Sequence, residues 1–265
     1  MRISAIIPSF DTSRNENVER LVADLRQQSR PPDEIEVVNG ISPNGRARNA
    51  GVERTAGEVL VFLDDDVRLG TPNIMESFVQ YLTADPQLGM VGTSQRLPPD
   101  STSFQRRCAR QISRSESPVV GKLTDSDMVT TQCCAMRREV LAEVGGFHEQ
   151  IIRGVDPELR NRVRQAGYRI AVIPNAWHTH PMPTSLRALL RMAWRNGAAS
   201  AYSRRHFPET VLYNPEGHVG EFNAKVPFPR RVILNLGHLA FDLLTGRWYG
   251  FLYGMAYAMG NLTKH

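Results

Sequence analysis

The sequence predicts an α/β protein with a mostly parallel, doubly wound sheet flanked by helices. Short apolar runs alternate with segments of helical spacing through the first sixty residues, in the order strand, helix, strand, helix, strand. The apolar run 58–63 has the length and the β-branched content of a buried strand, and three aspartates follow it directly. Because ligands in open α/β sheets bind beyond the carboxyl ends of strands, we expect a ligand site at this acidic strand end.

The predicted elements keep this alternation along the chain. Strands are expected at residues 2–8, 34–38, 58–63, 89–94, 128–136 and 168–173, and helices at 15–28, 46–55, 71–84, 137–144, 156–166 and 184–205. Thr71 and Pro72 suit the start of a helix, since threonine is a favoured N-cap and proline fits the first helical position. Residues 96–127 lose periodicity, so we expect a functional loop with one short helix there.

The C-terminal part differs in composition, which predicts a main unit over residues 1–183 and a helical extension over 184–265. The first helix of the extension carries Arg187, Arg191 and Arg195 on one face. Residues from 230 onward are apolar and aromatic but interrupted near Gly246, which predicts two helices joined by a turn.

The apolar tail allows three interpretations. Its aromatic and basic makeup suits an interfacial membrane anchor. A homodimer interface or a helical cap on the core would bury the same side chains equally well. The residues alone leave these alternatives open.

Charge and cysteine content restrict the partners and the compartment. The 265 residues have a formal net charge of +5, and arginine, which suits phosphate-rich partners, supplies most of the positive charge. Three cysteines, two of them adjacent, do not form a disulfide framework. No signal peptide and no run of about 18 apolar residues is found. These features favour a cytoplasmic location, either free or peripheral on the inner face of the cell membrane.

Three adjacent carboxylates, Asp64, Asp65 and Asp66, need a physical explanation. Like charges side by side at a strand end are unfavourable unless a cation neutralises them. Oxygen ligands suit a hard divalent ion such as Mg²⁺ or Mn²⁺, and that ion would hold a diphosphate. The alternative is a solvated acidic turn.

Taken in order, these segments resemble a bacterial family 2 glycosyltransferase with the GT-A fold. The matching stretches are Ile3-Ser-Ala-Ile-Ile-Pro-Ser9, Ala47-Arg-Asn-Ala-Gly51, the run from Ala56 to Asp66, Arg137-Arg138 through Gly145-Gly-Phe147, and Asp156-Pro-Glu-Leu159 through Ala166-Gly-Tyr168. They cover about residues 1–180. The resemblance implies inverting, metal-dependent transfer of a sugar from a nucleoside diphosphate sugar to a hydroxyl acceptor, which includes a lipid-linked glycan, and no nucleic-acid partner.

The resemblance also assigns roles to individual positions. Substrate contacts are expected from Pro8, Ser9, Asp11, Asn39, Arg48, Asn49, Asp64, Asp65 and Glu158, and metal contacts from Asp66, Asp64 and His180. Asn39 stands where the family often has an aspartate that hydrogen-bonds the base. Since an amide both donates and accepts whereas a carboxylate only accepts, the identity of the base is left open.

Asp156 matches the second residue of the family's Glu-Asp pair, and Val155 replaces the first. The resemblance makes Asp156 the general base that accepts the proton of the acceptor hydroxyl. Glu158 is the reserve base, and the alternative for Asp156 is a plain helix N-cap. We expect Asp156 to face the acidic strand end across a cleft, and we expect the triplet to be held by a metal ion. Internal ion pairs within the triplet would argue against sugar transfer.

His178 and His180 alternate along an extended segment, so their side chains should point to opposite faces. Only one of them can then reach a metal at the acidic strand end. The resemblance favours His180 for this contact, and the alternative is a hydrogen-bonded structural histidine.

Two further hypotheses remain open at this point. A retaining glycosyltransferase on the same fold would need no base, and Asp156 would then only position the sugar. A non-catalytic nucleotide-sugar-binding or membrane scaffold protein would account for Val155 and Asn39.

Overall fold

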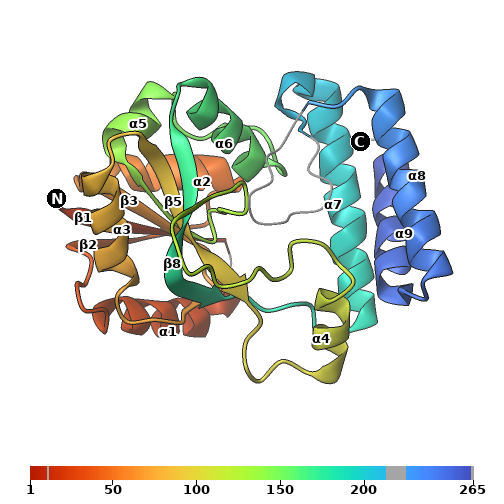
Figure 1. The fold of residues 1–265 in the computed structure, drawn as a ribbon, viewed down its shortest axis with the longest axis horizontal. Helices are drawn as coiled ribbons and strands as arrows, with labels where there is room; N and C mark the ends of the chain where they lie inside the picture. The colour runs from red at the N-terminus through yellow and green to blue at the C-terminus, as the bar shows by residue number, and fades with distance from the viewer. Residues whose placement is uncertain (11, 213–224, 264–265) are drawn as a thin grey trace.

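The predicted apolar runs form one mixed sheet in the computed structural model, which describes residues 1–10, 12–212 and 225–263 (Figure 1). Its strands are β1 (Ile3–Ser9), β2 (Glu34–Asn39), β3 (Val59–Leu63), β4 (Arg68–Leu69), β5 (Leu88–Arg96), β6 (Thr124–Asp125), β7 (Cys133–Arg137) and β8 (Arg169–Thr179). Their order is β2-β1-β3-β7-β5-β8-β4, and β6 pairs with β8. The sequence did not predict the two-residue strands β4 and β6.

Most of the sheet is parallel, as predicted. Strand β1 pairs in parallel with β2 and β3, and β5 pairs in parallel with β8. Strand β7 lies antiparallel between β3 and β5. Strand β8 continues past Pro174 to Thr179, beyond the predicted end at residue 173. This extra length carries the strand past the edge of the sheet where β3 ends.

Helices cover both faces of the sheet (Figure 1). They are α1 (Asn15–Arg26), α2 (Asn44–Glu53), α3 (Ile74–Ala84), α4 (Ser103–Ala109), α5 (Arg138–Glu143), α6 (Val155–Gln165), α7 (Leu186–His206), α8 (Phe228–Leu244) and α9 (Trp248–Leu262), with short 3₁₀ turns at Thr12–Arg14 and Pro208–Thr210. Alternate residues of β1 and β3 pack on α1 and α3, and the others pack on α2, α5 and α6. Burial on both faces explains why these strands are continuously apolar.

The start of α3 differs from the prediction. The helix begins at Ile74, and Thr71 is not its N-cap. The side chain of Gln28 replaces that cap, because its Oε1 accepts the Ile74 backbone N–H at 2.9 Å and its Nε2 donates to the Thr71 carbonyl at 3.0 Å. A side chain 46 residues earlier therefore sets this boundary.

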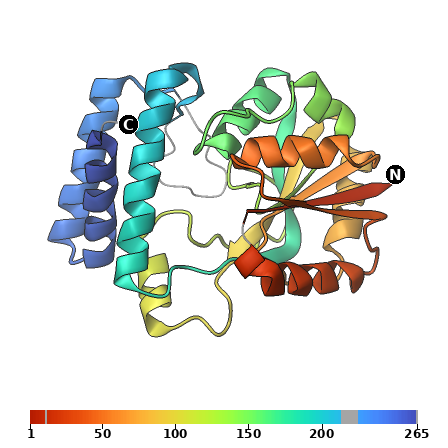
Figure 2. The same cartoon turned by 180° about the vertical axis from the view of Figure 1, so that it is seen from behind.

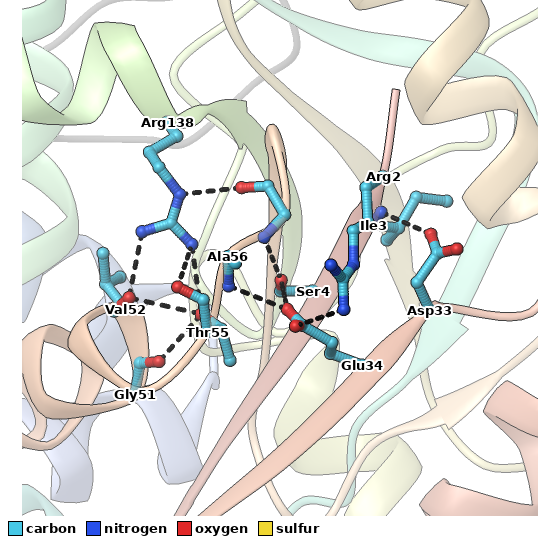
Figure 3. A network of polar contacts seen from close by, with 11 residues as sticks. Arg2, Ile3, Ser4, Asp33, Glu34, Gly51, Val52, Thr55, Ala56 and Arg138 are labelled. Atoms are coloured by element: carbon cyan, nitrogen blue, oxygen red, sulfur yellow. Dashed lines mark hydrogen bonds and ion pairs between the residues drawn. The ribbon is translucent and has the colours of Figure 1, made fainter.

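A polar network closes the edge of the sheet opposite to the acidic strand end (Figure 3). Glu34 accepts hydrogen bonds from the Ser4 hydroxyl and from the Ala56 backbone N–H, the latter at 2.9 Å. Arg138 donates to the Val52, Thr55 and Gly57 carbonyls at 2.7–2.9 Å. The Val52 carbonyl lies in the last turn of α2 and the other two follow the helix, where a cation also interacts favourably with the helix dipole.

Helices α7, α8 and α9 lie together beside the sheet, on the right in Figure 1 and on the left in Figure 2. Two glycines allow α7 and α9 to pack closely. A Cβ atom at Gly197 would lie 2.0 Å from the Tyr257 carbonyl oxygen, and one at Gly260 would lie 2.1 Å from the Trp194 carbonyl oxygen. Among the described residues, no helix has the length and apolar character needed to cross a membrane.

We predict that Gly197→Ala destabilises the protein, because its methyl group would meet the α9 backbone rather than a flexible side chain. Overpacking of this kind costs about 1–3 kcal/mol. The measurement is thermal unfolding followed by circular dichroism. Gly237→Ala on α8 is the matched control: its Cβ meets nothing within 4 Å, so a stability equal to or above that of the wild type is expected. Equal melting of the Gly197→Ala variant and the wild type would contradict the packing argument.

Candidate functional site

The polar residues at the end of β1, β2 and β3 share one edge of the sheet. In the parallel pairing, Ser9 at the end of β1 lies opposite Asn39 at the end of β2. Strand β3 lies on the other side of β1, and its last residue, Leu63, leads directly into Asp64. The structure therefore brings together Pro8, Ser9, Asn39 and the acidic triplet, as expected for the carboxyl ends of neighbouring strands.

Pairing of β4 with β8 brings His180 to the triplet. Arg68 lies opposite Thr179 and Leu69 opposite His178 in this antiparallel pair. His180, the residue after the pair, and Asp66, two residues before it, are thus brought together, with His180 Nε2 3.3 Å from Asp66 Oδ1. The residue pattern at 68–69 predicts neither the pairing of β4 with β8 nor the contact between Asp66 and His180.

Each carboxylate of the triplet has a cationic partner in the chain. Arg48 Nη2 lies 2.7 Å from Asp64 Oδ1, and Arg14 Nη1 lies 2.7 Å from Asp65 Oδ1 and 3.5 Å from Asp66 Oδ2. The expectation that the triplet has no internal ion pairs is therefore wrong. The pairs leave the site open, because the side chains of Asp64 and Asp66 keep 26% and 21% of their surface exposed.

Asp64 has a perturbed acidity. Burial raises its pKa to about 6, although the charges of Arg48 and His180 oppose the rise. The charges of Asp66 and Asp156 add to the rise. That Asp156 and the acidic strand end face each other across a cleft stays a prediction.

Asp66 and His180 change each other's acidity in opposite directions. Burial opposes both changes. The hydrogen bond and charge of His180 nevertheless hold the pKa of Asp66 below its ordinary value, and those of Asp66 raise the pKa of His180. Each of the two groups therefore stabilises the charged form of the other.

Asp65 points back into the fold. It is 4% exposed, its Oδ2 accepts the Ser9 hydroxyl at 2.9 Å, and its Oδ1 accepts Arg14. Ser9 and Asp65 thus tie β1 to the end of β3, and their assignment as substrate contacts stays a prediction. Sequence reasoning missed Arg14, since a single arginine in a short 3₁₀ turn carries no periodic signal.

Arg48 and Asn49 have different surroundings although they are adjacent on α2. Arg48 is buried beside Asp64, with its guanidinium 5.6 Å from the Phe147 ring centroid. The Asn49 side chain exchanges two hydrogen bonds with the Phe147 backbone, both at 2.9 Å. Asn49 therefore fixes the loop that supports Arg48, and its predicted contact with substrate stays untested.

Asp156 lies in the first turn of α6. Gly154, with a φ of 90°, is the N-cap, so the interpretation of Asp156 as the N-cap is wrong. Its carboxylate instead accepts a hydrogen bond from the Thr131 hydroxyl at 2.6 Å. Thr131 lies two residues before β7 and was not found from the sequence, because the antiparallel course of β7 places it at this edge.

Glu158 points away from Asp156. Two residues along a helix correspond to a rotation of roughly 200°, which puts the two side chains on different sides of α6. Both Glu158 oxygens accept hydrogen bonds from Arg162, at 2.5 and 2.7 Å. Its use as a reserve base or substrate contact stays a prediction, and Asp11, the remaining predicted contact, lies outside the described residues.

The two histidines have separate environments. His178 is 1% exposed and its Nδ1 lies 2.7 Å from the Thr93 hydroxyl, whereas His180 contacts Asp66. This agrees with the expected alternation of the two side chains. Among the described residues, no three His, Cys, Asp or Glu side chains are grouped so as to hold a metal by themselves.

We predict that His178 makes the fold acid-sensitive. Burial, assisted by the charge of His180, lowers its pKa from 6.5 to about 3. The unfolded chain then binds a proton that the folded chain rejects, so stability is lost as the pH falls below 6.5. This effect amounts to about 2 kcal/mol between pH 7 and pH 5.

Urea unfolding at pH 7 and pH 5 measures this difference. His178→Asn is expected to be less stable at pH 7 but to lose less stability on acidification than the wild type. His206→Asn, at an exposed position of α7, makes the same chemical change and should keep the wild-type dependence. An identical loss in the wild type and in His178→Asn would contradict the prediction.

Comparison with known sequences adds independent information. The family model described as "Glycosyltransferase like family 2" matches residues 11–199. The pre-mycofactocin glycosyltransferase of Mycobacterium tuberculosis is 28% identical over 188 residues, which cover 67% of this chain and 39% of that protein. The O-antigen chain rhamnosyltransferase RfbN of Salmonella typhimurium is 25% identical over 213 residues, covering 68% of this chain and 66% of that protein. The chain thus spans about two fifths of the length of the mycobacterial relative.

Among solved structures, the mannosyltransferase PcManGT from Pyrobaculum calidifontis, in complex with GDP-Man and Mn²⁺, has a similar fold. The TM-score is 0.59 at 18% identity, and the likeness covers 98% of this chain and 87% of that one. This similarity confirms the predicted GT-A arrangement of the sheet and helices.

Proposed function

The chain belongs to the family described as glycosyltransferase like family 2, and on this basis we propose that it transfers a sugar from a nucleoside diphosphate sugar to a hydroxyl acceptor. We further propose that the transfer inverts the anomeric carbon and depends on Mn²⁺ or Mg²⁺. Residues 1–183 would form the catalytic unit, and 184–265 the extension. The observation that supports the proposal is a pair of hydrogen bonds from neighbouring residues: the Asp64 backbone N–H donates to the Gln132 carbonyl at 3.2 Å, and the Thr131 hydroxyl donates to Asp156 at 2.6 Å.

The donor set fits a hard divalent ion. Asp66 and Asp64 offer partly exposed carboxylate oxygens, and the His180 imidazole lies beside Asp66. Mg²⁺ is usually held by one or two carboxylates together with substrate phosphates, so a set of this size is sufficient when the donor is present. When bound there, the ion would supply Lewis-acid stabilisation of the negative charge on the leaving diphosphate.

The nucleotide would lie along the ends of β1 and β2. Asn39 is exposed and next to Ser9, where its amide can both donate to and accept from a base. A nucleoside diphosphate donor is supported by the GDP-Man in the complex of the Pyrobaculum mannosyltransferase. The donor of this chain need not carry the same sugar or base. Arg14, which is half exposed, adds a positive charge near the predicted position of the diphosphate.

Asp156 would act as the base. The hydrogen bond from Thr131 engages its Oδ1 and orients the carboxylate. The Oδ2 atom has no hydrogen-bond partner among the described residues, so it can accept the proton of the acceptor hydroxyl as that oxygen attacks the anomeric carbon. A hydroxyl acceptor on a lipid carrier is a narrower form of the proposal.

We predict that Asp66→Asn weakens binding of the nucleotide together with Mn²⁺ by at least about tenfold, because a neutral amide is a poorer ligand for a hard cation. Isothermal titration calorimetry with nucleoside diphosphates and Mn²⁺ measures the loss. Asp85→Asn is the matched control, since Asp85 is also partly exposed and pairs with an arginine, Arg169, at 2.7 Å, but lies before β5 at the other edge. Unchanged affinity of the Asp66→Asn variant for nucleotide and Mn²⁺ would exclude Asp66 as a metal-binding residue.

We predict that Asp156→Asn keeps donor binding and lowers transfer by about 10²–10⁴-fold, the usual contribution of a general base. The asparagine can still accept the Thr131 hydrogen bond, so the fold should be retained. Turnover and donor affinity are measured in parallel. Near-normal turnover would refute the role of Asp156, and a larger loss in Glu158→Gln would move that role to Glu158.

The same assays separate the alternatives. The anomeric configuration of the product distinguishes inversion from retention. Donor hydrolysis with several nucleotide-sugars and Mn²⁺, in the absence of acceptor, distinguishes an enzyme from a binding protein. The hypothesis of a non-catalytic binding protein is supported most by Val155, which replaces the family's glutamate.

A further inference from the structure

Helix α8 exposes its apolar side chains to solvent. Ile233, Leu236 and Leu244 are 68%, 60% and 85% exposed, and none of the α8 side chains that the structure describes is buried. The side of α8 that faces α9 is itself partly apolar, since Leu239 lies against Gly254 and the Asp242 carboxyl lies against Gly250. Large apolar side chains that are also exposed on the outer side of the helix form a patch of the kind that marks an interaction surface.

Helix α9 continues this pattern. Trp248, Met255, Met259 and Leu262 are all exposed and follow one another at intervals of seven, four and three residues, which places them on one side of the helix. The opposite side of α9 packs on α7. We call the exposed apolar residues of α8 and α9 the C-terminal apolar face, and these two helices lie side by side (Figures 1 and 2).

Positive charge is concentrated in the same part of the chain. Residues 184–265 contain ten lysines and arginines against four aspartates and glutamates, whereas residues 1–183 contain 22 against 23. Within α8 and α9 the one acid, Asp242, is paired with Arg247 at 2.9 Å, and Arg230 is exposed at the start of α8. The apolar face therefore lies on the basic part of the protein.

We propose that the C-terminal apolar face binds the surface of an anionic lipid bilayer, with α8 and α9 lying in the interface. Apolar side chains that enter the acyl boundary, flanked by arginines that meet anionic headgroups, are the two components of such binding. Trp248 suits the headgroup level, because its indole ring is largely apolar but carries one polar N–H group. A second copy of the chain would instead bring two positively charged surfaces together.

The proposal is separate from the proposed catalytic function, but it has a geometric consequence for it. Arg153, three residues before Asp156, stacks over the Tyr257 ring of α9 at 5.9 Å and accepts a hydrogen bond from Ser203 of α7 through its carbonyl at 3.3 Å. A bilayer bound to α8 and α9 would therefore stand at a fixed position relative to Asp156.

Flotation of the full chain with lipid vesicles tests the proposal. Binding is expected to vesicles of phosphatidylcholine mixed with phosphatidylglycerol, and weaker binding to phosphatidylcholine alone. The triple variant Ile233→Gln, Leu236→Gln and Leu244→Gln should bind the mixed vesicles at least about tenfold more weakly, because three apolar side chains are lost from the interface. Val119→Gln, an exposed apolar residue beside the sheet, is the matched control and should bind like the wild type.

The charge component is tested separately. Arg230→Gln should weaken binding to the mixed vesicles about fivefold, which corresponds to about 1 kcal/mol per arginine, and should leave binding to phosphatidylcholine unchanged. Light scattering of the wild type and of the triple variant gives the oligomeric state. A dimer that the triple variant dissociates, without vesicle binding, would assign the face to a second copy and overturn the proposal.

Absence of vesicle binding by a monomeric wild type, or equal binding by the triple variant, would also overturn it. Circular dichroism and nucleotide titration of the triple variant keep this result apart from the catalytic proposal. Retained helicity and retained nucleotide affinity are expected, since the three side chains are exposed and lie on α8.

Discussion

Neutralisation of the acidic end of β3 is the constraint on which the site depends. Three adjacent carboxylates in a partly buried position repel one another, and basic side chains from three separate segments contact them. Arg14 comes from the turn after β1, Arg48 from α2, and His180 from the residue after β8. Each pair positions one segment around the acidic strand end. Arg14 holds the turn after β1, Arg48 is buried on α2, and His180 is brought in by the pairing of β8 with β4.

These pairings divide the triplet by role. Asp65 is almost fully buried and joins β1 to β3 through Ser9, whereas Asp64 and Asp66 keep exposed surface. Arg14 and Arg48 lie against these carboxylates and offset their negative charge. A divalent ion and a diphosphate would bring positive and negative charge together, so their joint binding leaves that balance nearly unchanged. Ion pairs in the triplet are therefore compatible with a metal-dependent site, contrary to the expectation from the sequence.

The sequence predicted the parts of the fold and site that depend on local pattern. Continuous apolar runs identified the strands. The rule that ligands bind at the carboxyl ends of strands predicted that Ser9, Asn39 and Asp64 lie at one edge of the sheet. Contacts between distant segments were missed. Gln28 replaces Thr71 as the cap of α3, and Thr131 reaches Asp156 only because β7 runs antiparallel. No periodicity or turn residue encodes such pairs.

The helical extension is mechanically part of the site rather than a separate appendage. The chain passes from His180 into α7 within six residues, and α7 and α9 pack with almost no space between their backbones at Gly197 and Gly260. Arg153 then links both helices to the loop before Asp156. Because close-packed helices move together, α7 and α9 connect the segment that carries His180 with the loop before Asp156.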